Sequence, residues 1–126
     1  MKEVMVIIRM NKINETKKAL AAAGISSMHA KECLGRGKGI VDFNALKGAE
    51  LGYEEAISRL GQSQRLVPKR MISIVVPDKL VSRVVTTIMT VNHTGKSGDG
   101  KIFVLPVLDA IRVRTGENGD SILDEV

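Results

Sequence analysis

A short stretch rich in glycine and lysine carries the clearest chemical signal in this chain. It reads TGKSGDGK over residues 94–101 and lies between an apolar segment with helical spacing and an apolar segment with strand character. Glycine leaves backbone N–H groups open to close approach, and lysine supplies positive charge. The stretch therefore predicts a loop that binds a phosphate-bearing ligand. Its candidate contacts are Thr94, Gly95, Gly98, Asp99, Gly100 and Lys101.

The same loop satisfies only part of the P-loop pattern. Residues 95–101 give the required glycine, four further residues and then Gly-Lys. Ile102, however, stands where the pattern needs the Ser or Thr that holds magnesium. The predicted order is also reversed, because a P-loop leads from a strand into a helix. These features argue against an ordinary P-loop NTPase and favour a phosphate-binding loop of another design. An aspartate before a glycine is typical of a turn, so we interpret Asp99 as turn-forming rather than as a base or a metal contact.

Two further cationic clusters and one lysine have the same chemical character. The sequence GRGKG at 35–39 again combines glycine with cations, and Lys69 follows Pro68. Arg112 and Arg114 alternate, so in a strand their guanidinium groups would share one face and match phosphate oxygens. Taken singly, these features also fit a solvated hinge, an exposed basic strand and a solvated charge. We expect them to converge on one anionic ligand, with a neighbouring subunit bringing the last strand. The additional candidates are Gly35, Arg36, Gly37, Lys38, Lys69, Arg112 and Arg114.

Composition limits the possible classes of protein. The chain has 126 residues, a hydrophobic fraction of 44% and a net charge of +5, which suit one compact domain over 1–126 with an anionic ligand or partner. No apolar run approaches the ~20 residues of a membrane span, and we expect a cytoplasmic protein. Aromatic content is only 2%, which disfavours an RNA-binding module that stacks bases. Cys33 is the single cysteine, so no internal disulfide forms, and we expect no metal site with His29 or His93.

Hydrophobic periodicity predicts the elements that position these residues. Asp78 is suited to cap the second of two helices, Gly24 to end the first, and Pro77 to end a strand. The order is β-α-β, a long excursion, then β-α-β, which predicts an α+β, ferredoxin-like βαββαβ fold with an antiparallel sheet. The strands are apolar on both sides, so we expect a partner subunit to cover the free face. We predict strands at 4–8, 25–34, 72–76 and 102–107, helices at 11–23 and 78–91, and a continuing or pairing strand at 111–113.

The excursion between the second and third strands is too long for an ordinary connection. Loops of this length in compact domains are usually functional or disordered. Charged and apolar residues alternate within it, and residues 49–60 are suited to a short helix. We favour a docking surface over a tolerated surface insertion.

Several motifs together resemble the PII family of nitrogen-regulatory proteins. The sequence TGKSGDGKIFV at 94–104 resembles the family's C-terminal signature, and RVRTGE at 112–117 its closing segment. KGAE at 47–50 is similar to the tip of the family's long T-loop, here residues 36–68, and VVPD at 75–78 also matches. The resemblance implies a trimer with ATP or ADP in each cleft between subunits. It also implies that 2-oxoglutarate binds beside Mg-ATP and reorders a T-loop that docks on targets.

Residue by residue, the resemblance assigns roles within this cleft. Gly98, Gly100 and Lys101 resemble the nucleotide-loop contacts, and Arg112 and Arg114 resemble phosphate contacts. The base of the T-loop corresponds to Gly35, Arg36 and Lys38, and the lysine that helps hold 2-oxoglutarate corresponds to Lys69. Residues expected in target docking are Lys47, Glu50, Leu51 and Tyr53.

Three departures from the family pattern narrow the resemblance. Leu51 stands where the family's modified tyrosine would follow Glu50, and Tyr53 is a poor substitute. Gly37 stands where the family has a glutamine between Arg36 and Lys38 that serves magnesium and 2-oxoglutarate. The T-loop is also longer than usual. These departures resemble the PII branch encoded beside nitrogenase genes in methanogenic archaea, and within it the second of two paired proteins.

The expected function is therefore a regulator and not an enzyme. We expect ATP or ADP, with Mg²⁺ and 2-oxoglutarate as further effectors, to control docking on dinitrogenase or another target. The assembly is either a homotrimer or a hetero-oligomer in which a paired PII-like protein supplies the effector site. The alternatives are a slow nucleotide-hydrolysing enzyme on the same cleft and a general PII regulator of another nitrogen-metabolism target.

Overall fold

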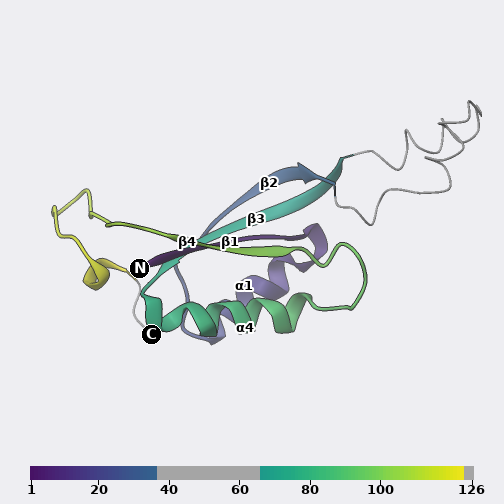
Figure 1. Ribbon diagram of the computed structural model, residues 1–126, viewed down its shortest axis with the longest axis horizontal. Helices are drawn as coiled ribbons and strands as arrows, with labels where there is room; N and C mark the ends of the chain where they lie inside the picture. The colour runs from purple at the N-terminus through teal and green to yellow at the C-terminus, as the bar shows by residue number, and fades with distance from the viewer. Residues whose placement is uncertain (37–65, 124–126) are drawn as a thin grey trace, which may run out of the picture.

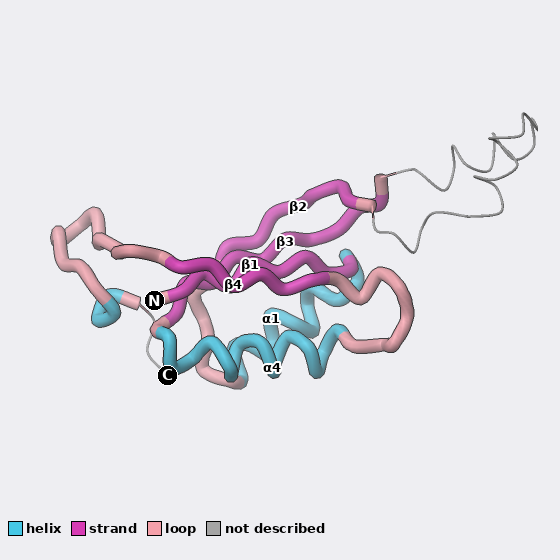
Figure 2. Tube along the Cα trace, in the orientation of Figure 1, coloured by secondary structure: helices cyan, strands magenta, loops and turns pink. Residues whose placement is uncertain are grey.

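The computed structural model describes residues 1–36 and 66–123, and its centre is a four-stranded antiparallel sheet (Figure 1). The strand order β2-β3-β1-β4 is the ferredoxin-like order, so the predicted fold is confirmed. The two α-helices of the described residues, α1 (Ile13–Ala22) and α4 (Val81–Asn92), cover the same face of the sheet (Figure 2). The strands are β1 (Lys2–Arg9), β2 (His29–Gly35), β3 (Val67–Val76) and β4 (Lys101–Pro106).

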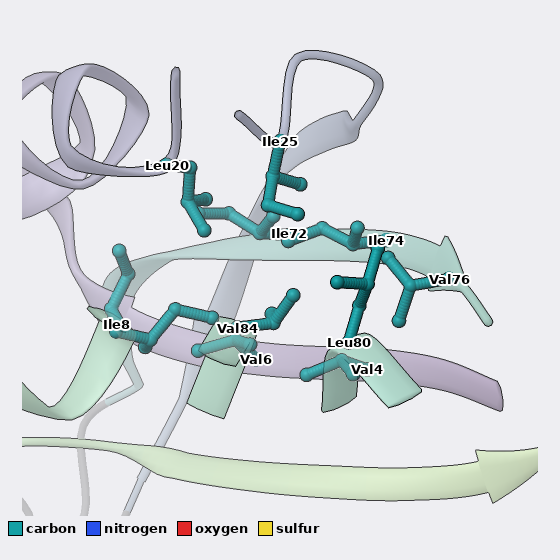
Figure 3. Close-up of a cluster of buried hydrophobic side chains, with 11 residues drawn as sticks. Val4, Val6, Ile8, Leu20, Ile25, Ile72, Ile74, Val76, Leu80 and Val84 are labelled. Atoms are coloured by element: carbon teal, nitrogen blue, oxygen red, sulfur yellow. The ribbon is translucent and has the colours of Figure 1, made fainter. Parts of the chain in front are cut away.

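Alternation along the two central strands builds the core. Val4, Val6 and Ile8 of β1 are at most 1% exposed, while their odd-numbered neighbours are only partly buried. Since successive strand residues point to opposite faces, the buried set faces the helices. Each fully buried aliphatic side chain contributes roughly 1.5–3 kcal/mol through burial. Residues from the helices, the loop after α1 and β3 complete this cluster (Figure 3): Leu20, Ile25, Ile72, Ile74, Val76, Leu80, Val84 and Ile88.

The first helix ends as the sequence predicts but begins later. Gly24 has φ 86°, and its N–H donates to the Ala21 carbonyl at 3.0 Å while the Ile25 N–H donates to the Leu20 carbonyl at 2.8 Å. This pair of bonds is the glycine-terminated helix end. A 3₁₀ turn at Met10–Lys12 replaces the first predicted turn of helix. Ile25 is 2% exposed but lies in the loop before β2, so the predicted strand at 25–34 begins too early.

The predicted helix cap at Asp78 is wrong. A 3₁₀ turn at Asp78–Leu80 precedes α4, and no side-chain capping hydrogen bond forms there. The Asp78 carboxylate instead accepts a hydrogen bond from Lys2 Nζ at 3.1 Å. The Asp78 carboxylate is therefore engaged in a long-range ion pair with Lys2 and does not cap the helix. Pro77 does follow the last residue of β3, as predicted.

The β2–β3 ladder extends further than the sequence predicts. β3 begins at Val67, which pairs with Gly35, and Pro68 pairs with Leu34. Pro68 is tolerated because β3 pairs with β1 only as far as Lys69, so no second neighbour needs its missing N–H. The predicted helix at 49–60 lies outside the described residues.

After β4 the chain leaves the sheet and reverses direction. Ile111 forms a single bridge with Asn118, and the Arg112 N–H donates to the Glu117 carbonyl at 2.8 Å. The Gly116 N–H returns to the Arg112 carbonyl at 2.7 Å. The predicted strand at 111–113 is therefore wrong, because local turn bonds replace pairing with β4. Figure 1 shows this segment projecting beyond the sheet.

The sheet face opposite the helices carries apolar side chains. Alternation places Met5 and Ile7 there, and their neighbours in register are Phe103 on β4 and Met71 on β3. Phe103 is 42% exposed, and no described element covers this face. The expected apolar character of this face is thus present at Met5, Ile7, Met71 and Phe103, but Glu3 and Ser73 lie on the same face and hydrogen-bond to each other.

Candidate functional site

The glycine loop leads from the end of α4 into β4 and depends on glycine conformations. Gly95, Gly98 and Gly100 have φ values of 83°, 98° and 110°. These angles lie in the left-handed region that side chains disfavour. At Gly100 a Cβ atom would also lie 1.9 Å from the Ile7 carbonyl oxygen of β1. The loop can therefore lie against β1 only with a glycine at position 100.

Asp99 organises the first half of this loop. Its Oδ2 accepts hydrogen bonds from the N–H groups of Thr94 at 2.8 Å and Gly95 at 3.0 Å. Its Oδ1 accepts from the Thr94 hydroxyl and from Arg9 Nη1, the latter at 2.6 Å. The Thr94 hydroxyl, followed by the Thr94 N–H and Arg9, holds the pKa of Asp99 well below its usual range. The carboxylate is thus a structural acceptor and a poor base, which agrees with its interpretation as turn-forming.

Two cations from neighbouring strands hold the carbonyl oxygens of the second half. Arg9 Nη2, at the end of β1, donates to the Ser97 carbonyl at 2.9 Å. Lys69 Nζ, from β3, donates to the Gly98 carbonyl at 3.2 Å. Arg9 and Lys69 are partners in the β1–β3 register, so both cations approach the loop from one place. Lys69 was predicted as a site residue, whereas the sequence reasoning missed Arg9.

These contacts determine where the following N–H groups point. In a trans peptide the C=O and the next N–H point in opposite directions, and no peptide in the described chain is cis. With the Ser97 and Gly98 carbonyls facing Arg9 and Lys69, the Gly98 and Asp99 N–H groups face away. Within residues 1–36 and 66–123 these two N–H groups have no protein acceptor. Such successive free amides are suited to bind an anion.

The helix side of β4 borders a hollow of about 450 Å³. Val85 and Met89 of α4 and Val104 of β4 contribute apolar walls. Asp99, Gly100 and Lys101 line the end nearest the glycine loop. Lys101 is exposed and follows Asp99 by two residues, at the start of β4.

The end of β2 joins the glycine loop through Lys69. A Cβ at Gly35 would lie 3.8 Å from Lys69 Cγ, and Arg36 follows directly. The structure therefore brings Gly35, Lys69 and Gly98 close together. The other residues predicted around the T-loop lie outside the described part of the chain: Gly37, Lys38, Lys47, Glu50, Leu51 and Tyr53.

Arg112 and Arg114 do not join this cluster within one chain. β4 begins with Lys101 beside Ile7 and ends with Pro106 beside Lys2, so the arginines follow the opposite end of the strand (Figure 1). They also lie in a turn and share no strand face, contrary to the prediction. Arg112 Nη1 instead donates to Glu117 Oε2 at 3.1 Å, a partner that the sequence did not reveal.

The described residues meet neither the requirement for a three-residue metal site nor that for a membrane-spanning helix. No group of three or more His, Cys, Asp or Glu side chains in residues 1–36 and 66–123 is arranged to hold a metal ion. Cys33 is a free thiol on β2, and His93 Nδ1 lies 4.0 Å from Asp99 Oδ2. No helix in the described ranges has the length and apolar character needed to span a membrane.

Comparisons with known proteins agree with this arrangement. A family model described as nitrogen regulatory protein P-II matches residues 1–117. A nitrogen fixation nifHD region GlnB-like protein 2 from Methanobacterium ivanovii is 52% identical, with 98% of this chain and 99% of the relative covered. The nitrogen regulatory protein P-II 1 of Escherichia coli strain K12 is 38% identical, with 98% and 100% covered.

The fold has a solved counterpart as well. The crystal structure of Arabidopsis thaliana PII bound to citrate matches with a TM-score of 0.71 at 31% sequence identity. The match covers 99% of this chain and 90% of the plant protein.

Proposed function

Because the chain belongs to the PII family of nitrogen-regulatory proteins, we propose that its glycine loop binds ATP or ADP and thereby controls docking on a nitrogen-metabolism target. The fixed orientation of the Gly98 and Asp99 N–H groups carries this proposal. The two free amides offer hydrogen bonds to phosphate oxygens on a loop already held in place, and the exposed Lys101, two residues after Asp99, adds a positive charge.

In this proposal the protein is a trimer, and each nucleotide cleft lies between two neighbouring copies of the chain. Arg112 and Arg114 lie at the far end of β4 from Lys101, so they contribute to the same phosphate site only from a neighbour. The apolar sheet face around Met5 and Phe103 supports a covered interface. Leu108 and Val113 are fully exposed in the single chain, which also favours contact with another copy. A paired PII-like protein in place of an identical copy would satisfy the same geometry.

The T-loop connects the nucleotide to the target. In sequence, the T-loop at 36–68 begins after Gly35 of β2 and ends before Lys69, whose side chain contacts the glycine loop. A ligand that changes this contact shifts the population of T-loop conformations only by binding one of them more tightly. We propose that Lys69 helps to bind 2-oxoglutarate beside Mg-ATP. Because Gly37 replaces the glutamine of the family, the paired protein would supply that glutamine. Relatives named for the nifHD region favour dinitrogenase as the target of this cytoplasmic regulator.

Calorimetric titration with MgATP tests the nucleotide site directly. Replacing Lys101 with alanine removes a charge-assisted contact, and we expect affinity to fall about 10- to 100-fold. Lys79→Ala is the matched control, because Lys79 is an exposed lysine in the turn before α4, away from the loop. Equal affinity of the Lys101→Ala and Lys79→Ala variants would contradict the role of Lys101. Adding 2-oxoglutarate with MgATP then shows whether this chain senses the effector alone, and phosphate release tests the enzymatic alternative.

A further inference from the structure

Resting on the nucleotide site proposed above, we propose that Arg9 is a positioning residue that fixes the glycine loop for phosphate binding. It holds Asp99 and the Ser97 carbonyl at the same time and thereby sets the direction of the amides that follow. In this role Arg9 acts through the loop and does not contact the ligand itself.

The guanidinium group spans two parts of the loop. Nη1 lies 2.6 Å from Asp99 Oδ1, and Nη2 lies 2.9 Å from the Ser97 carbonyl oxygen. Both side chains of the ion pair are only about a quarter exposed, at 26% for Arg9 and 24% for Asp99. The planar fork of arginine donates along fixed directions, so it constrains the two acceptors relative to each other.

The backbone of Arg9 is held in place at the end of the central strand β1. It follows Ile8, which is 1% exposed in the core, and pairs with Lys69 at the end of the β1–β3 ladder. The contact crosses 88 to 90 residues of sequence, so it joins β1 to a loop that local bonds alone would not place. The loop position therefore depends on the central strand of the sheet.

Space around Gly98 shows how closely the guanidinium lies against the loop. A Cβ added at Gly98 would lie 3.3 Å from Arg9 Nη2 and 3.6 Å from Lys69 Nζ. The two cationic groups therefore lie against the side of the loop to which the Ser97 and Gly98 carbonyl oxygens point. Because the peptide planes are fixed from this side, the Gly98 and Asp99 N–H groups are presented on the other side.

A lysine at position 9 would preserve the charge but not this geometry. Its ammonium is a point charge on a flexible stem and offers no planar pair of donors. The Arg9→Lys variant therefore separates positioning from simple electrostatic attraction. Arg83→Lys is the matched control, because Arg83 is an exposed arginine on α4.

Titration of the full chain with MgATP, combined with amide NMR of the nucleotide-free protein, tests the inference. We expect Arg9→Lys to lower MgATP affinity about tenfold and to shift the Gly98 and Asp99 amide resonances. The Gly24 amide, at the distant end of α1, should not shift, which distinguishes a positioned loop from general destabilisation. Arg83→Lys should behave as the wild type.

Two other outcomes overturn the positioning role of Arg9, and a third overturns the nucleotide site as well. Wild-type affinity and loop resonances in Arg9→Lys overturn the positioning role and leave the nucleotide site intact if Lys101→Ala still loses affinity. A lower affinity with unshifted loop amides also overturns it, because Arg9 then acts on the ligand directly. Failure of the wild-type protein to bind MgATP overturns the nucleotide site and the inference together.

Discussion

The two ends of β4 hold the two cationic clusters, and they are built in different ways. At the start of the strand, the glycine loop is held by Arg9 and Lys69, which are 88 to 90 and 29 residues distant in sequence. Beyond its far end, Arg112 contacts Glu117, only five residues away. One cluster is therefore fixed by the tertiary fold, and the other is a local turn.

The two regions also differ in the exposure of particular side chains, although most residues of both are exposed. Asp99 is about three-quarters buried within the loop, whereas Leu108 and Val113 beyond the far end are fully exposed. A region with its own long-range contacts is complete in one chain. A region that exposes apolar and cationic side chains together needs another surface, and in this protein we assign that surface to a neighbouring copy.

The largest expected effect tests how tightly the first cluster is fixed. Gly100→Ala places a Cβ 1.9 Å from the Ile7 carbonyl oxygen at a φ of 110°. Backbone strain of about 1–2 kcal/mol and overpacking of about 1–3 kcal/mol should both lower the free energy of unfolding. Urea unfolding measures the loss. Gly116→Ala in the far turn, with nothing within 4 Å of its Cβ, should show the strain alone; equal losses in the two variants would contradict the comparison.

A mixing experiment tests whether the two clusters meet between copies. We expect Lys101→Ala and Arg112→Ala each to weaken MgATP binding about 10- to 100-fold when pure. When the two variants are unfolded, mixed and refolded together, some clefts should combine an intact Lys101 with an intact Arg112 from the neighbour. Calorimetry of the mixture should then recover high-affinity sites. If both residues serve one cleft from the same chain, no such sites will appear.

The smallest expected effect is the pH dependence of the stability that the Asp99 carboxylate contributes. The folded-state pKa of Asp99 lies below its ordinary value of about 3.9, so its stabilising contribution is present above that value and is lost as pH falls through the lower folded pKa. Asp99→Asn should therefore be less stable than the wild type at pH 7, and the difference should shrink below about pH 4. Thermal unfolding across pH 3–7 checks this. A difference that stays constant through the acid range would contradict the role of the carboxylate.

Local sequence signals predicted the elements well where local physics decides them. The β-branched apolar run at 4–8 and the glycine at position 24 predicted a strand and a helix end that the structure confirms. They failed where a distant partner competes, as at Asp78, whose carboxylate pairs with Lys2 rather than capping a helix. They also failed at Arg112, because a turn closed by Gly116 is locally as good as a strand.

By itself, the sequence determined the fold class, the family and the glycine loop, since periodicity and short motifs are properties of neighbouring residues. Only the tertiary structure added Arg9 to the cations that hold that loop. Arg9 ends an apolar strand and shows no motif of its own, yet the β1–β3 register places it beside Lys69 and under Ser97. Such contacts arise from strand pairing across most of the chain, and no local pattern encodes the direction of a side chain at that distance.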